Sequence, residues 1–135
     1  MNQTMYLTSI GMPPAEGPND EKVYTIFCAD SNEKCGTIVL RPQNPSSVYI
    51  WWYLDEQFRG KGYMFDAVAQ ILPSLLERYH RIVAMIWTTN NRSKQLAARC
   101  GFHYESTATH LDQKPDGTWQ NVEFWALVEG YHVIP

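Results

Sequence analysis

The chain has 135 residues, a formal net charge of −3 at pH 7 and no run of basic residues. This length predicts one domain, and the charge excludes a nucleic-acid binder that depends on a Lys/Arg patch. Three cysteines without a metal-ligand spacing, an N-terminus without a signal-peptide pattern and the lack of an apolar run of about 20 residues predict a cytoplasmic protein with free thiols, no metal and no membrane contact.

Strand signals dominate the first part of the chain. The Pro/Gly-rich segment 11–20 (GMPPAEGPND) predicts a loop, and Met5–Ile10 before it is a candidate strand. Lys22–Ala29 and Gly36–Leu40 are rich in β-branched and aromatic residues, and the polar turn DSNEK joins them, so they predict a hairpin. Val48–Leu54 is apolar on both faces, which is typical of a central strand covered on both sides.

Two helices with a strand between them are predicted next. Tyr63–Tyr79 carries an apolar stripe at helical spacing, and Pro73 within it predicts a kink or a break near Ala69–Leu72. Arg81–Thr88 (RIVAMIWT) predicts another buried strand. Arg92–Cys100 predicts a second helix that ends at the glycine following it.

Two further strands complete the predicted sheet. Phe102–Leu111 and Thr118–Val128 are strand-like and are joined by the turn QKPDG. The helix between two buried strands implies a parallel, right-handed crossover, and the hairpins imply antiparallel pairing. We therefore expect residues 1–135 to form one domain of α/β (α+β) class, with a single mixed, mostly antiparallel sheet, a central parallel strand pair and helices on both faces.

The segment Gln57–Gly62 (QFRGKG) lies between a buried strand and a helix start. Such a position presents unpaired backbone N–H groups and the positive end of a helix dipole. Gly60 and Gly62 allow close backbone approach, and Arg59 and Lys61 add positive charge. The segment therefore predicts a site for a pyrophosphate or a similar anion. The alternative is an ordinary glycine-containing turn with two solvated basic residues.

Two motifs carry a family resemblance. Gln57–Gly62 matches the pattern Q/R-x-x-G-x-G/A, and Asn90–Ser93, separated by seven residues from Gly101-Phe102, matches N-x-x-S/A…G-F. On these motifs the chain resembles the GNAT superfamily of N-acetyltransferases. The segments YLDEQFRGKGYM and NNRSKQLAARCGF are similar to its ribosomal-protein N-terminal acetyltransferase branch. The resemblance extends from about Val48 to Val128, and the region before it agrees only in strand order.

The resemblance implies a GNAT fold, acetyl-CoA as co-substrate and direct transfer of the acetyl group to an amine. In this family, backbone N–H groups at the helix start hold the CoA pyrophosphate. A central strand splayed from its parallel neighbour holds the pantetheine arm. The implied acetyl-CoA site consists of Trp52, Tyr53, Leu54, Gln57, Phe58, Arg59, Gly60, Lys61, Gly62, Tyr63, Asn90 and Ser93.

Acyl transfer needs a neutral amine, donors for the thioester carbonyl and a proton donor near the departing thiolate. Family members often carry a tyrosine for the thiolate where Ala97 stands here. Ser93 is the replacement that we predict, because its hydroxyl can donate to sulfur. Its alternative role is to cap the second helix. Tyr63 and Tyr104 are weaker candidates.

The general base is less well defined by the sequence. Asp55, just after the central strand, and Glu105, on a late strand, are the two predicted catalytic carboxylates. Further candidates are Glu56, Glu123, His103 and His110. Each of these alone is more often a solvated charge or a structural side chain. Cys100 has no base partner in view and is interpreted as a core residue.

Two features bear on the acceptor side. Trp51 and Trp52 are adjacent on a strand and point to opposite faces, so at most one is expected to line the cleft. Family members place one or two helices between the first and second strands, and the segment 11–20 is too short for them. We therefore expect these helices to be shortened or missing, and the acceptor side to be open or completed by the second subunit of a homodimer.

The sequence is compatible with three functions. The first is an active N-acetyltransferase that acts on a primary amine: a small amine, a protein N-terminus or a lysine. The second is a catalytically degenerate family member that binds CoA or a protein partner, which the missing tyrosine and helices motivate. The third is an interaction module unrelated to CoA, which the surplus of aromatic residues, with five Trp and eight Tyr, motivates.

Overall fold

The computed structural model describes residues 5–9, 21–28 and 31–130, and of residues 5–9 it describes the backbone alone. The predicted loop at 11–20, and with it the question of the N-terminal helices, lies outside the described residues. The elements in chain order are β1 (Met5–Ser9), β2 (Lys22–Cys28), β3 (Lys34–Asn44), β4 (Ser47–Leu54), the 3₁₀ helix η1 (Glu56–Phe58), α1 (Tyr63–Arg78), β5 (Arg81–Trp87), α2 (Asn91–Arg99), β6 (His103–Gln113) and β7 (Trp119–Val128).

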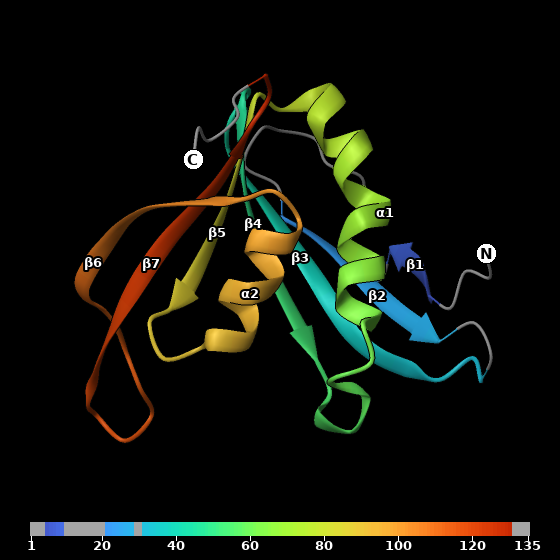
Figure 1. The fold of residues 1–135 in the computed structure, drawn as a ribbon, viewed down its shortest axis with the longest axis horizontal. Coiled ribbons are helices and arrows are strands. Elements are labelled where there is room, and N and C mark those ends of the chain that lie inside the picture. Colours follow the sequence, from blue (N-terminus) through green and yellow to red (C-terminus); the bar gives the residue numbers. More distant parts are fainter. Residues whose placement is uncertain (1–4, 10–20, 29–30, 131–135) are drawn as a thin grey trace.

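The described strands form one seven-stranded sheet in the order β1-β2-β3-β4-β5-β7-β6 (Figure 1). The pairing of β4 with β5 is parallel, and the other pairings in this sheet are antiparallel. The helix α1 makes the crossover between the two parallel strands, as such a connection requires. The predicted mixed, mostly antiparallel sheet with a central parallel pair is therefore confirmed.

Both described helices cover the same face of the sheet. The apolar stripe of α1, which includes Val68, packs in one buried cluster with alternate residues of β4, such as Ile50, and with Ala97 of α2. The two helices also touch each other, because the guanidinium carbon of Arg99 lies 4.2 Å from the ring centroid of Phe65. Figure 1 shows α1 and α2 side by side in front of the strands.

The prediction of helices on both faces is therefore wrong for the described part of the chain. It rested on the apolar character of both sides of the central strand. The residues of β4 that point away from the helices are Tyr49, Trp51 and Tyr53, and the last is 56% exposed. Aromatic side chains with a polar atom tolerate a partly wet surface, so this pattern does not require a second helical layer.

The ends of the two helices follow the local sequence. The side-chain oxygen of Asn90 accepts a hydrogen bond from the backbone N–H of Ser93 at 3.2 Å and caps α2. Gly101, with a φ of 96°, allows the chain to leave this helix, as predicted. The predicted break in α1 is absent: the helix runs through Pro73 to Arg78. Its buried stripe holds it in place despite the backbone hydrogen bond that proline lacks.

The parallel strands β4 and β5 separate halfway along their length. Their pairing runs from Ser47 opposite Arg81 to Ile50 opposite Ala84 and then ends. Beyond that point β4 continues to Leu54 next to β3, and β5 continues to its end next to β7. The predicted splay is present, and it leaves a wedge between the two central strands (Figure 1).

Candidate functional site

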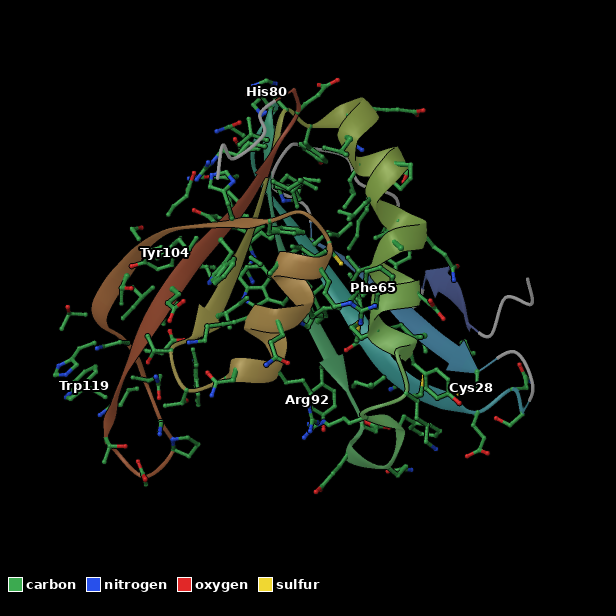
Figure 2. All side chains as sticks on the ribbon, viewed as in Figure 1. Cys28, Phe65, His80, Arg92, Tyr104 and Trp119 are labelled. Atoms are coloured by element: carbon green, nitrogen blue, oxygen red, sulfur yellow. The ribbon has the colours of Figure 1, made fainter. Side chains whose placement is uncertain are left out.

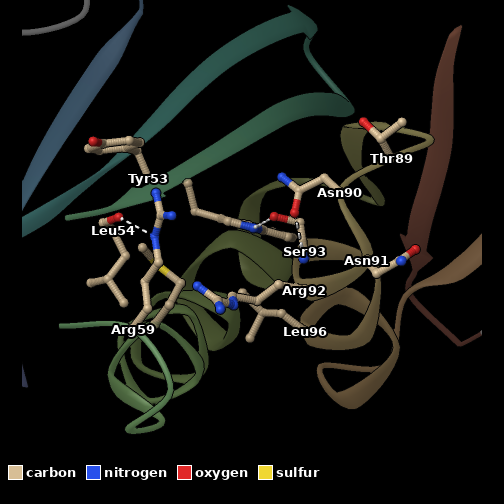
Figure 3. A pocket seen from close by; sticks show the side chains of 11 residues that line it. Tyr53, Leu54, Arg59, Thr89, Asn90, Asn91, Arg92, Ser93 and Leu96 are labelled. Carbon is tan, nitrogen blue, oxygen red and sulfur yellow. Dashed lines mark hydrogen bonds between the residues drawn. The ribbon is translucent and has the colours of Figure 1, made fainter. Parts of the chain in front are cut away.

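A pocket of about 370 Å³, here called the main pocket, lies between the end of β4 and the start of α2 (Figure 3). Its lining comes from both elements, from Arg59 and from the first turns of α1. The lining residues are Trp52, Tyr53, Leu54, Arg59, Met64, Thr89, Asn90, Asn91, Arg92, Ser93 and Leu96. Six of the predicted acetyl-CoA residues are therefore brought together here: Trp52, Tyr53, Leu54, Arg59, Asn90 and Ser93.

A second pocket, the helix-end pocket, surrounds the N-terminus of α1. It is lined by Leu54, Gly60, Gly62, Tyr63, Met64, Phe65, Arg92, Gln95, Leu96 and Arg99. Gly60 and Gly62 both have a φ of 80°, and a Cβ atom on either would have open space around it. No side chain caps α1 at Gly62. The N–H groups of the first helical turn have no acceptor within the helix, so they are available to an anion.

Arginine side chains border these two pockets. The Nε–H of Arg59 donates to the backbone oxygen of Leu54 at 3.0 Å, which holds the side chain across the pocket mouth. Arg92 lines both pockets, and Arg99 lies over the ring of Phe65. Figure 3 shows Arg59 and Arg92 reaching toward the same space from the two sides of the main pocket. The positive charge and the free N–H groups together favour a polyanionic ligand.

Arg92 and Arg99 are missing from the site that the sequence predicts. The signal that points to them is their spacing of seven residues, which places both on one face of α2. That spacing indicates a common face but does not say whether the face meets solvent or the start of another helix. The contact between Arg99 and Phe65 of α1 supplies this information.

A third pocket, the wedge pocket, fills the gap between the splayed strands. Its lining residues are Ile50, Trp51, Trp52, Ala84, Met85, Ile86, Trp87, Asn90 and Ser93. It shares Trp52, Asn90 and Ser93 with the main pocket, so the two cavities meet at these residues. No charged side chain occurs in this lining. The wedge pocket has a volume of about 190 Å³, which suits a small uncharged group.

Both tryptophans of β4 line the wedge pocket, where at most one was expected in the cleft. They do point to opposite faces of the sheet. Trp52 lies edge-on to Phe102 on the helix side, with centroids 6.0 Å apart, whereas Trp51 lies beside Tyr49 and under the guanidinium of Arg41 on the other side. Both border the wedge pocket because the strands no longer pair at this level and leave the gap between them open.

The hydroxyl of Ser93 has a defined partner. Its Oγ lies 3.1 Å from the indole nitrogen of Trp52, and the dashed line in Figure 3 marks this bond. The indole N–H can only donate, so the serine oxygen accepts. Because Asn90 caps α2, the alternative role of Ser93 as the helix cap does not apply. The side chain is instead held at the meeting point of the main and wedge pockets.

The two predicted catalytic carboxylates do not reach these pockets. Glu105 on β6 forms a bidentate ion pair with Arg81, with one oxygen 2.7 Å from Nη1. Hydrogen bonds from Arg81 lower the pKa of Glu105, which weakens it as a base. Asp55 follows β4, where its backbone N–H donates to the oxygen of Cys35 at 2.8 Å. Neither residue lines any of the three pockets.

The remaining predicted residues have other surroundings. Gln57, Phe58 and Lys61 lie in the segment before α1 but line none of the three pockets. Glu123 is held by Lys94 at 3.1 Å and by the indole N–H of Trp125 at 3.0 Å, below α2. Figure 2 shows Trp119 and Tyr104 on the β6–β7 side of the molecule, away from Arg92 and Phe65.

The three cysteines are free thiols, as predicted. Burial raises the pKa of Cys100 to about 11 and is the main cause that raises the pKa of Cys35 to about 12. Thiols with such pKa values are poor nucleophiles at neutral pH. This agrees with the interpretation of Cys100 as a packing residue.

The described residues contain neither a candidate metal cluster nor a helix that could span a membrane. No group of three or more His, Cys, Asp or Glu side chains in these parts of the chain is arranged to hold a metal ion. None of the helices found there has the length and apolar character needed to cross a membrane.

Comparison with known proteins gives consistent matches. The chain matches the family model of the acetyltransferase (GNAT) domain over residues 3–103. It is 27% identical over 116 residues to the probable N-acetyltransferase YjcK of Bacillus subtilis, a match that covers 82% of this chain and 63% of that protein. It is 32% identical over 81 residues to the ribosomal protein uS5-alanine N-acetyltransferase of Escherichia coli, which covers 58% and 41% of the two chains.

Among solved structures, the chain is similar to RimL, a ribosomal L7/L12 α-N-protein acetyltransferase, in complex with coenzyme A. The TM-score is 0.73 at 26% identity, over 80% of this chain and 62% of that chain. The chain thus spans less than two thirds of the length of each of these relatives. The family model covers most of the chain. The two sequence motifs lie where they were predicted, Gln57–Gly62 just before α1 and Asn90–Ser93 at the start of α2. This chain belongs to the GNAT acetyltransferase family.

Proposed function

We propose that the protein is an acyl-CoA-dependent N-acyltransferase that moves an acetyl group from acetyl-CoA to a primary amine in a ternary complex. The observation that carries the proposal is the meeting of the main pocket and the wedge pocket at Trp52, Asn90 and Ser93. A thioester that enters along the main pocket and an amine that enters through the wedge pocket would meet there. Direct attack needs this arrangement, because it holds two substrates at once.

Acetyl-CoA fits the chain of cavities from the helix-end pocket to the wedge. Its pyrophosphate would bind the backbone N–H groups from Arg59 to Tyr63, in the segment Gln57–Gly62, with Arg92 and Arg99 nearby. Its pantetheine arm would run along the unpaired edge of β4 beyond Ile50. The complex of RimL with coenzyme A supports this cofactor for the family.

The acceptor that fits best is an amine of low pKa. In the reaction the amine nitrogen bonds to the acetyl carbon, the C–S bond breaks with its electron pair on sulfur, and the amine loses a proton to water. None of the described residues that line the wedge pocket is an acid or a histidine. A site without a base favours an α-amino group, with a pKa of about 7.7–8.0, over a lysine, with a pKa of about 10.4. RimL, named as an α-N-protein acetyltransferase, and the relative named as a ribosomal protein uS5-alanine N-acetyltransferase support this acceptor class.

Binding of acetyl-CoA tests the first half of the proposal. Calorimetry on the wild type should show saturable binding, and Gly62→Glu should weaken it at least about 100-fold, because it places a carboxylate where the pyrophosphate would lie. Gly117→Glu is the matched control. Gly117 has a φ of 88° and open space around it like Gly62, but it lies in the β6–β7 turn. Equal losses in both variants, or no binding by a folded wild type, would refute the CoA site.

Turnover tests the second half. A peptide with a free α-amino group and a matched Nα-acetylated peptide with one lysine are compared as acceptors by release of the CoA thiol. We expect turnover of the first peptide at pH 7.5 and little of the second. Turnover of the lysine peptide alone would overturn the acceptor class. Binding of CoA without turnover of either peptide, or of a panel of small amines, would favour a catalytically degenerate CoA-binding module.

Assembly and location complete the proposal. We propose a homodimer, because the face of β4 that carries the exposed Tyr53 would then be covered on the acceptor side. Sedimentation of the protein at micromolar concentration checks this, and a monomer would refute it. We also propose a cytoplasmic location, which the three free thiols support.

A further inference from the structure

The bond between Trp52 and Ser93 joins the splayed strand to the helix beside it. The two residues are 41 positions apart in the chain, and their contact lies at the level where β4 has left β5. The N–H of the indole has no acceptor function, so the direction of this bond is fixed: Trp52 donates and the serine oxygen accepts. The serine proton must therefore point elsewhere.

The other contacts of Ser93 leave its hydroxyl proton free to bond to a ligand. The backbone N–H of Ser93 is used in the cap by Asn90. Within the described part of the chain, the Ser93 hydroxyl donates to no protein acceptor. Ser93 lines both the main pocket and the wedge pocket, so an acceptor atom of a ligand at their junction lies on the open side of the hydroxyl.

The indole ring of Trp52 packs against a buried aromatic side chain. It meets the ring of Phe102 at an interplanar angle of 81°, and Phe102 is 4% exposed. Phe102 follows Gly101, just after the end of α2, so the chain leaving the helix that carries Ser93 supplies the residue that packs against Trp52. A donor packed in this way restricts the position of its acceptor and the rotation of the hydroxyl.

We infer that Trp52 is a positioning residue: its indole N–H orients the Ser93 hydroxyl so that the serine proton points at the sulfur of the thioester. This inference rests on the proposed function. When the amine has bonded to the acetyl carbon, the C–S bond breaks and its electron pair remains on sulfur. Ser93 donates a hydrogen bond to this thiolate and keeps its proton, so CoA leaves as the thiolate and takes its proton from water. The bond from Trp52 polarises the hydroxyl and strengthens this donation.

The test is a double-mutant cycle with Trp52→Phe and Ser93→Ala. Phenylalanine keeps an aromatic ring but lacks the N–H. We expect Trp52→Phe to lower kcat by about tenfold, the effect of losing one hydrogen bond in the transition state, with KM for acetyl-CoA changed by less than about twofold. In the Ser93→Ala background the same substitution should cause no further loss of kcat, because the bond that it removes is already gone.

Trp125→Phe is the matched control. Trp125 is also a half-buried tryptophan on the helix face of the sheet, and its indole N–H donates to Glu123 instead. Its kcat should stay at the wild-type value. A fall in kcat from Trp52→Phe that persists undiminished in the Ser93→Ala background would overturn the inference, and so would an unchanged kcat in Trp52→Phe.

Two further outcomes are distinguishable. A folded wild type without turnover on any amine would remove the proposed function and the inference together, whereas additive losses remove only the inference. Should Trp52→Phe fail to fold, the ¹H–¹⁵N resonance of the Trp52 indole replaces it. Coenzyme A should shift this resonance more in the wild type than in Ser93→Ala, because proximity of the ligand acts in both proteins and the hydrogen bond to the serine adds its effect only in the wild type. Equal shifts in both proteins would overturn the inference.

Discussion

Different kinds of chemical group form the two ends of the candidate site. At the start of α1 the site consists of backbone: two glycines with a φ of 80° and a helix N-terminus without a side-chain cap. At the wedge it consists of side chains from distant segments, with Trp52 of β4 bonded to Ser93 of α2. The first end depends on local chain geometry and the second on tertiary packing. Substitutions should therefore act differently at the two ends.

The largest effect is expected from a substitution at Gly36 in β3, the strand that pairs with β4 beside the site. A Cβ atom at Gly36 would lie 2.2 Å from the backbone oxygen of Tyr53, so the two strands must move apart in Gly36→Ala. Overpacking of this kind costs about 1–3 kcal/mol or more, and here it distorts the edge of β4 that lines the main pocket.

We expect Gly36→Ala to lower Tm by several degrees and to weaken acetyl-CoA binding as well. Thermal melts and calorimetry measure the two effects. Gly117→Ala, at an open glycine in the β6–β7 turn, should lower Tm less and leave binding unchanged. A Gly36→Ala protein with wild-type affinity would show that the site does not depend on the edge of β4.

The second prediction separates the contribution of the arginine charges from that of the backbone N–H groups at the start of α1. Arg92→Ala with Arg99→Ala removes two cations that line the helix-end pocket. We expect KM for acetyl-CoA to rise about tenfold, more at low salt than at high salt, and kcat to change little, because neither arginine lines the wedge pocket. Arg78→Ala is the control, since Arg78 also lies over an aromatic ring, at the other end of α1. A large fall in kcat would contradict the separation of the two ends.

The difference between local chain geometry and tertiary packing explains which parts of the site can be predicted from the sequence. Glycines in a strand-to-helix turn impose their geometry locally, so Gly60 and Gly62 predict the anion site without knowledge of the fold. The elements and the parallel crossover are also predictable, since period and turn residues are local signals. The bond from Trp52 to Ser93 is not, because it depends on how α2 sits against β4. The placement of both helices on one face is missed for the same reason.

The predicted role of Glu105 is a similar case. Its position on a late strand made it a candidate base, but the sequence does not reveal that Arg81 lies within hydrogen-bonding distance of it. The register of three strands brings the two together, since β7 pairs with both β5 and β6. A carboxylate acts as a base only if no strong cation holds it, and that condition is tertiary.

The third prediction concerns the cap that holds Ser93. Asn90→Ala removes the acceptor of the first turn of α2, a loss that costs about 1 kcal/mol. We expect a lower Tm and a kcat reduced about threefold, because the turn that carries Ser93 loosens. In Asn44→Ala, which removes a comparable hydrogen bond that the backbone N–H of Ser46 donates to the Asn44 side-chain oxygen, only Tm should fall. Equal kcat values in the two variants would show that the cap serves stability alone.

The smallest effect is expected at Glu105. Because Arg81 lowers its pKa in the folded state, the ion pair stabilises the fold above about pH 4.3, the ordinary pKa of Glu, and this stabilisation is lost as the pH falls through the folded pKa. Glu105→Gln should therefore lower Tm slightly at pH 7, because a partly exposed pair contributes less than about 1 kcal/mol to the free energy of unfolding, and the difference in Tm from the wild type should shrink toward pH 3. Its kcat at pH 7 should equal that of the wild type, because Glu105 lines none of the three pockets. A kcat that collapses while Tm is preserved would instead make Glu105 the general base and require the acceptor to approach from the β6 side.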